Sequence, residues 1–182
     1  LEITTRSRHK WTIFTHRFDR HQTFPELSKI NLVELLPKAS VKRTFSEVIK
    51  TSINIAKQKL DLRNFDVLVV LCEGVGDFIM FRNNSIPVVC ICLTPLRPVF
   101  DEYYKKKYLE GKGRYVKIKL QIFGTMFKII DKLLWKNYQH IFCISNEVKN
   151  RILKGRLTKE DKLEVVYPGI DYNLLKPTWQ YE

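Results

Sequence analysis

Short apolar runs alternate along this chain with stretches whose apolar positions recur every three or four residues. The runs are rich in β-branched and aromatic residues, and a short run of this kind favours a strand over a buried helix. The predicted strands are 11–15, 31–36, 65–71, 87–93, 139–144 and 163–167. Helices are predicted at 45–60, 100–108 and 115–138, and another follows Ser145, whose hydroxyl can cap it.

This alternation of apolar strands and helices predicts an α/β fold, with a Rossmann-like, mainly parallel sheet flanked by helices. In such sheets, ligands bind just beyond the carboxyl ends of the strands. Unusual residues follow three of the predicted strands directly: Glu73 with Gly74, the stretch 94–97 (TPLR), and Ser145. We therefore expect the functional site at that edge of the sheet.

The charge of the chain is the main compositional signal. Its 182 residues are 45% hydrophobic and carry a net charge of +13. A basic surface can face nucleic acid, anionic lipid or a phosphorylated small ligand, and charge alone does not choose among them. No apolar run approaches the ~18 residues that span a bilayer.

The cysteines do not follow the spacing of a metal site. Cys72, Cys90, Cys92 and Cys143 all fall in strand patterns, with no CxxC pair or Cys/His cluster. We expect four small, buried, apolar residues in a reducing compartment and no bound metal.

Three segments carry a family resemblance. They are VVYPGIDYNLLKP at 165–177, the strand, serine and helix of 139–153, and CICLTPLRPVFDEYY at 90–104. In their order and spacing they resemble the N-terminal half of GT-B glycosyltransferases of family 4. The resemblance implies an acceptor-side domain at 1–167, without its first strand and helix. It also implies that 168–182 begins the linker to a donor-binding domain, with Gly169 and Asp171 in the interdomain turn.

The activity implied by the resemblance is transfer of a sugar with retention of configuration, of the hexosyltransferase type. The donor would be a UDP- or GDP-linked sugar, and the acceptor a glycan, polysaccharide or glycolipid. No metal is expected, since basic side chains and helix N-termini can neutralise a diphosphate. Most donor contacts would lie in the second domain, so this segment alone is expected to be inactive and to hold no cofactor.

Candidate acceptor contacts are assigned to the strand ends, each with a structural alternative. Arg97 can bind a phosphate or an acceptor hydroxyl, or instead pair with Asp101 one helical turn later. Thr94 can bind through its hydroxyl or cap the following helix. Ser145 is expected to act more as a helix cap than as a contact.

Two acids and one missing histidine complete the candidate site. Glu73 and Asp77 can orient acceptor hydroxyls, although the glycines between them can also simply form a tight turn. Where the family pattern often has a histidine before Thr94, this chain has Leu93. We therefore assign no catalytic residue: either another side chain substitutes or activity is impaired.

The basic segment 101–140 suggests where the protein works. It contains ten Lys or Arg against four acids, interleaved with aromatic and aliphatic residues. Such a helix can lie on an anionic membrane, at ~1 kcal/mol per surface cation, or can pack on the core with solvated lysines. The first reading suits a cytoplasmic enzyme at the inner face of a membrane, acting on a lipid-linked acceptor.

Two other function classes stay open at this point. A nucleic-acid-binding domain would fit the charge, but no zinc pattern or RNP-like stretch appears, so no nucleic-acid partner is expected. A non-catalytic interaction domain would fit the replacement of the family's histidine by Leu93.

Overall fold

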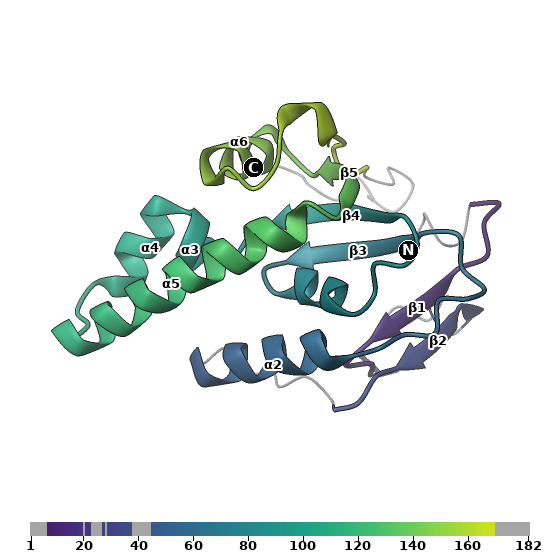
Figure 1. Ribbon diagram of the computed structural model, residues 1–182, viewed down its shortest axis with the longest axis horizontal. Coiled ribbons are helices and arrows are strands. Elements are labelled where there is room, and N and C mark those ends of the chain that lie inside the picture. Colours follow the sequence, from purple (N-terminus) through teal and green to yellow (C-terminus); the bar gives the residue numbers. More distant parts are fainter. Residues whose placement is uncertain (1–6, 20, 23–26, 28, 38–44, 170–182) are drawn as a thin grey trace, which may run out of the picture. The chain divides into compact units, whose positions relative to one another are not determined.

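The computed structural model describes residues 7–19, 21–22, 27, 29–37 and 45–169 (Figure 1). The chain forms two compact units, residues 1–54 and 55–182. No helix in the described ranges combines the length and apolar character needed to cross a membrane.

Unit 1 contains a small parallel sheet and most of one helix. Strands β1 (Thr12–Thr15) and β2 (Asn31–Glu34) pair in parallel, and the Asn31 side-chain amide donates a hydrogen bond of 3.0 Å to Thr12 Oγ1. Helix α2 (Phe45–Lys57) follows β2, and its last residues, from Ile55, belong to unit 2. The predicted strands and helix of this region are confirmed, with ends that differ by up to three residues.

Unit 2 is built on a four-stranded parallel sheet. Its strands are β3 (Leu68–Glu73), β4 (Val88–Thr94), β5 (Tyr138–Cys143) and β6 (Leu163–Val165), and their spatial order is their order along the chain. Each connection therefore moves one strand in the same direction. Because parallel crossovers are right-handed, helices between these strands are expected on one face of the sheet.

The connections of unit 2 contain more helical segments than the sequence pattern predicts. The elements are η2 (Gly76–Phe81), α3 (Arg97–Phe100), α4 (Glu102–Leu109), α5 (Arg114–Trp135), α6 (Asn146–Gly155) and η3 (Glu160–Lys162). The long basic helix and the helix after Ser145 are confirmed. The 3₁₀ turns and α3 have too few residues to give a hydrophobic period, so the pattern does not reveal them.

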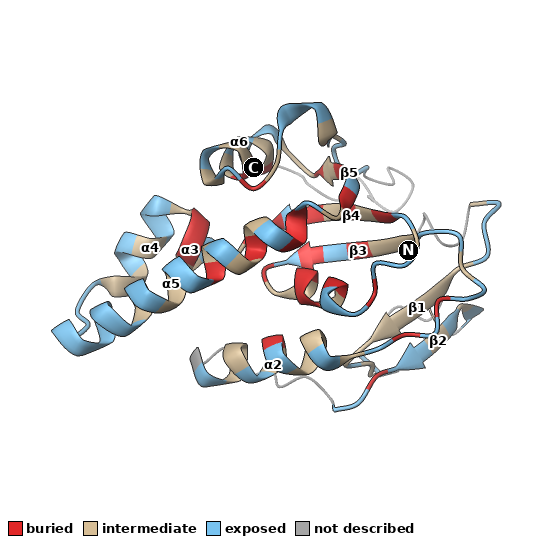
Figure 2. Cartoon of the chain, in the orientation of Figure 1, coloured by how far each residue is buried: buried red, intermediate tan, exposed pale blue. Residues whose placement is uncertain are grey.

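The core lies on one face of the sheet. Alternate strand residues such as Val70, Cys90 and Cys143 join one buried cluster with side chains of α3, α5 and α6. The buried stretches of these strands and helices are red in Figure 2. Leu71, whose side chain points to the other face, is 65% exposed. All four cysteines are buried and free, as the strand patterns predict.

Candidate functional site

The carboxyl ends of the parallel strands bring most of the candidate residues to one edge of unit 2. Glu73 is the register partner of Thr94, at the ends of β3 and β4. Cys92 pairs with Cys143 in β5, and Ser145 follows two residues later. Three segments far apart in the sequence thus meet where ligands of parallel sheets bind.

Gly74 lets the first two loops of this edge touch. Its φ of +107° is a conformation that side chains rarely adopt, and a Cβ there would lie 3.0 Å from Leu96 Cδ1. The glycine therefore permits the loop after β3 to approach the loop after β4. Beside it, Glu73 is exposed at the strand end.

Gly74→Ala is expected to lower the free energy of unfolding by about 1–3 kcal/mol, because the residue would combine a positive φ with a contact on Leu96. Chemical denaturation followed by tryptophan fluorescence measures the change. Gly124→Ala is the matched control: a Cβ at this α5 position would meet nothing within 4 Å. That variant is expected to gain stability, by up to about 1 kcal/mol. Equal effects of the two substitutions would contradict the role assigned to Gly74.

Thr94 is held by an arginine that the sequence pattern does not single out. Its buried hydroxyl accepts a 2.9 Å hydrogen bond from Arg151 Nη1 on α6. The same guanidinium pairs with Asp101 Oδ2 at 2.9 Å and with Glu147 at 3.2 Å. The alternative that Thr94 caps the next helix is wrong, because α3 has no side-chain cap.

Asp101 is engaged by α4 and α6. Its Oδ1 accepts the Tyr104 amide at 3.0 Å and so caps α4, while Oδ2 binds Arg151. The alternative in which Asp101 pairs with Arg97 is therefore wrong. Only the i, i+4 spacing of Glu147 and Arg151 was visible in the sequence, and nothing there linked Arg151 to Thr94.

Arg97 remains available at the edge. It is exposed as the first residue of α3, and no ion pair to it is present within the described part of the chain. Leu93 is the extra residue in β4 where the register with β3 shifts between Cys72 and Glu73, and it is 37% exposed. A leucine at this point supplies no proton acceptor or donor.

The remaining edge residues have structural roles or lie outside the description. Ser145 Oγ accepts the Val148 amide at 3.3 Å, so its expected role as the cap of α6 is confirmed. Gly169 lies in exposed coil, and a Cβ there would meet nothing within 4 Å. Asp171 lies outside the described residues.

Asp77, grouped with Glu73 on sequence grounds, lies in the core instead of at the edge. It is completely buried in η2 and accepts hydrogen bonds from Cys72 Sγ at 3.0 Å, from Trp135 Nε1 at 3.1 Å and from the Tyr138 hydroxyl. Its carboxylate therefore organises the packing of η2, β5 and α5 and does not reach an acceptor bound at the strand ends.

A second buried acid accompanies Asp77. Asp131, on α5, is 1% exposed, and neither of its carboxyl oxygens accepts a hydrogen bond. Burial, together with the charge of Asp77, raises the pKa of Asp131 to about 9. Burial also raises the pKa of Asp77, although its hydrogen-bond donors oppose this. The pair thus holds a proton near neutral pH, and Asp131 is the acid that carries it.

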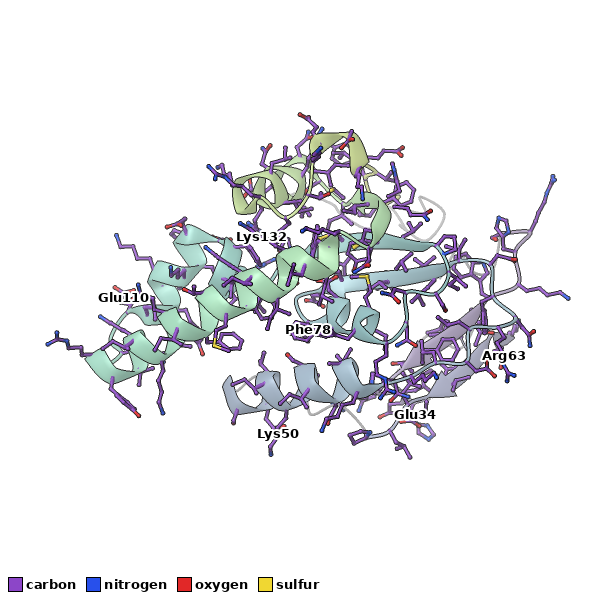
Figure 3. All side chains as sticks on the ribbon, in the orientation of Figure 1. Glu34, Lys50, Arg63, Phe78, Glu110 and Lys132 are labelled. Carbon is purple, nitrogen blue, oxygen red and sulfur yellow. The ribbon has the colours of Figure 1, made fainter. Side chains whose placement is uncertain are left out.

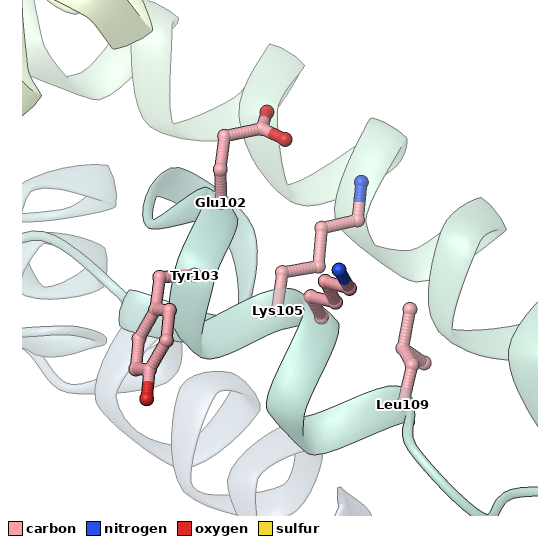
Figure 4. Close-up of a pocket in the computed structure, with 5 residues that line it drawn as sticks. Glu102, Tyr103, Lys105 and Leu109 are labelled. Carbon is pink, nitrogen blue, oxygen red and sulfur yellow. The ribbon is translucent and has the colours of Figure 1, made fainter.

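The surface hollow of this unit is not part of the candidate site at the sheet edge. A shallow hollow of about 460 Å³ is lined by Glu102, Tyr103, Lys105, Lys106 and Leu109, all from α4 (Figure 4). Among the residues that the structure describes, no group of three or more His, Cys, Asp or Glu side chains is placed to hold a metal ion. Among the candidate residues, Glu73 and Arg97 are therefore the exposed side chains of this edge, and the buried Thr94 is held by Arg151.

Comparison with known proteins agrees with this architecture. The model of Glycosyltransferase Family 4 matches residues 4–174, which is most of the chain. A search of curated proteins returned no match. The parallel sheet, the candidate residues at its carboxyl edge and the extent of the family match together show that the chain belongs to glycosyltransferase family 4, with the Rossmann-like fold of a GT-B half.

Proposed function

We propose that this chain is the acceptor-side half of a retaining glycosyltransferase of the hexosyltransferase type. Its donor would be a UDP- or GDP-linked sugar, and its acceptor a glycan or glycolipid. In the reaction, the bond from the anomeric carbon to the diphosphate breaks and a bond to the acceptor oxygen forms. The nucleoside diphosphate and one proton are released.

The observation that carries the proposal is the position of Glu73 and Arg97. Both are exposed polar groups at the carboxyl edge of the parallel sheet, in a chain that belongs to a glycosyltransferase family. A carboxylate can accept hydrogen bonds from sugar hydroxyls, and a guanidinium can donate several to an anionic or hydroxylated ligand. Glu73 would orient the acceptor, and Arg97 would bind a phosphate or an acceptor hydroxyl.

The Thr94–Arg151 pair would fix the loop that carries Arg97. Arg151 joins the end of β4 to α6 and to the cap of α4, so the residues between Thr94 and Asp101 are held at both ends. A site fixed by buried hydrogen bonds spends less binding energy on ordering its own side chains. We assign Thr94 and Arg151 to positioning and not to contact with the acceptor.

Other parts of the enzyme would lie beyond the carboxyl edge of the sheet. A second α/β domain after residue 182 would supply most donor contacts, with 168–182 leading into it. No metal would be required. Leu93 stands where the family pattern often has a histidine and can neither accept nor donate a proton, so we assign no catalytic residue to this chain. The site of action would be cytoplasmic, at the inner face of a membrane, with no nucleic-acid partner.

The test is a transfer assay with the complete reading frame that contains this segment. UDP- and GDP-sugars carrying a labelled sugar are offered with lipid extracts and oligosaccharides, and label in the product is counted. Arg97→Ala and Glu73→Gln are each expected to reduce transfer about 10-fold, which is the scale of one lost hydrogen-bonded contact. Activity in EDTA and the anomeric configuration of the product test the metal and the stereochemistry.

Arg63→Ala is the matched control. Arg63 is an exposed arginine paired with Asp61 at 2.6 Å, in the loop that enters β3 and so at the opposite end of this strand from Glu73 (Figure 3). Its loss should leave transfer unchanged. If no donor and acceptor pair supports transfer by the wild type, the proposed activity is refuted. If the Arg97 and Glu73 variants transfer as fast as the wild type, the roles of these two residues are refuted and the activity stands.

A further inference from the structure

Helices α4 and α5 carry a surface that the core does not use. In α4 no residue is buried, and in α5 the buried residues are Phe127, Asp131, Leu134 and Trp135, all in its second half. The first half of α5 runs beyond the sheet (Figures 1 and 2). The side chains on this surface therefore do not serve the packing of the core.

One exposed side of α5 is apolar along the length of the helix. Six large hydrophobic residues recur every three or four positions and so share one side of the helix. Each is between 48% and 70% exposed: Tyr115, Ile118, Ile122, Met126, Ile129 and Leu133. We call these six residues the α5 stripe. It is a second apolar side, distinct from the side that buries Phe127 and Leu134.

Cations border the α5 stripe. Between residues 102 and 136 the chain has ten Lys or Arg, whereas its acids there are Glu102, Glu110 and the buried Asp131. Lys132 lies on α5 and Glu110 in the turn before it (Figure 3). Lys119 Nζ lies 4.5 Å from the centre of the Tyr115 ring, so charge and apolar surface are in direct contact.

The positive charge beside the α5 stripe indicates which kind of partner this surface can bind. A second copy of the helix would match the apolar spacing but would bring lysines against lysines, which opposes association. A nucleic acid would neutralise the lysines but leave six large apolar side chains in water. A bilayer with anionic headgroups satisfies both, because apolar side chains enter the acyl boundary while the cations meet the headgroups.

We propose that the α5 stripe and its flanking lysines bind the surface of an anionic lipid bilayer, with α5 lying parallel to it. This inference uses only the surface of α5 and the cations beside it. It deepens the membrane location in the proposed function but does not depend on transferase activity, so membrane binding and transfer can each fail without the other.

The test is flotation of the full-length protein with lipid vesicles. Vesicles of 70% phosphatidylcholine and 30% phosphatidylglycerol are compared with pure phosphatidylcholine at low salt. Binding is expected to be at least 10-fold stronger to the anionic vesicles and to weaken in 0.5 M NaCl, because headgroup attraction is screened. The double variant Ile122→Glu, Met126→Glu is expected to lose at least 10-fold in binding with an unchanged melting temperature, since both residues are exposed.

A control variant adds negative charge on another helix. Ile53 of α2 is 47% exposed, and Ile53→Glu combined with Lys50→Glu adds at least as much negative charge outside α5. That variant should bind vesicles like the wild type. Three results would overturn the proposal: equal binding by the α5 double variant, dimers that the double variant dissociates, or binding to nucleic acid that the vesicles do not displace.

Discussion

Asp77→Leu is expected to lower the free energy of unfolding by about 3–5 kcal/mol, the scale seen when one partner of a buried polar network is removed. Asp77 accepts hydrogen bonds from Cys72, Trp135 and the Tyr138 hydroxyl, and these donors are all buried. Leucine fills a similar volume but offers no acceptor. Three donors would then stay in the core without partners, and urea denaturation would measure the loss.

Asp77→Asn separates the hydrogen bonds from the charge. The amide oxygen can still accept from Trp135 or Tyr138, while the NH₂ group adds donors to a site that already has three. We expect a smaller loss, about 1–2 kcal/mol. Trp135 fluorescence reports on the same site, since its indole N–H binds Asp77 directly. A leucine variant as stable as the wild type would show that these hydrogen bonds do not hold η2 against α5.

The sequence was informative where the hydrophobic pattern is long and regular. The strand pattern at 87–93 and the helical pattern at 115–138 were assigned correctly because many successive residues obey one period. The parallel sheet followed from their alternation. Once the sheet was inferred, the position of Glu73 and Thr94 at one edge followed too, because carboxyl ends of parallel strands coincide.

The sequence was uninformative where a contact joins distant segments. Thr94 and Arg151 are 57 residues apart, and no local pattern marks a threonine that binds an arginine on a later helix. Asp77 looked equivalent to Glu73 because both are acids beside a glycine. The strand continues to Glu73 and a 3₁₀ turn follows, which directs Asp77 inward. Side-chain direction after a strand depends on such turns and was not predictable from composition.

Asp131 is expected to make the stability of this protein fall as pH rises. Burial and the charge of Asp77 raise its pKa to about 9 in the folded state, against 3.8 when exposed. Between these values the folded protein holds a proton that the unfolded chain has released, so raising the pH favours unfolding. The free energy of unfolding keeps falling until the pH reaches about 9 and then levels off. The steepest slope for one proton is about 1.4 kcal/mol per pH unit.

Asp131→Asn should remove this dependence. An asparagine is neutral at every pH, as the protonated acid is, and it has a similar size. Among the other titratable groups of the cluster, Cys72, Cys90, Cys92 and Tyr138 have raised pKa values and stay neutral, so they do not add to the slope. The raised pKa of Asp77 adds a dependence of the same sign, which the variant keeps, so the comparison isolates Asp131.

Denaturation curves for the wild type and the Asp131→Asn variant should therefore diverge between pH 5.5 and 8.5. The variant is expected to gain about 1 kcal/mol per pH unit relative to the wild type, and so about 3 kcal/mol over this range. Parallel curves would mean that Asp131 is ionised in the folded protein. The pair would then carry two charges in the core, with Cys72, Trp135 and Tyr138 all donating to Asp77. The lack of any donor to Asp131 would require a different explanation.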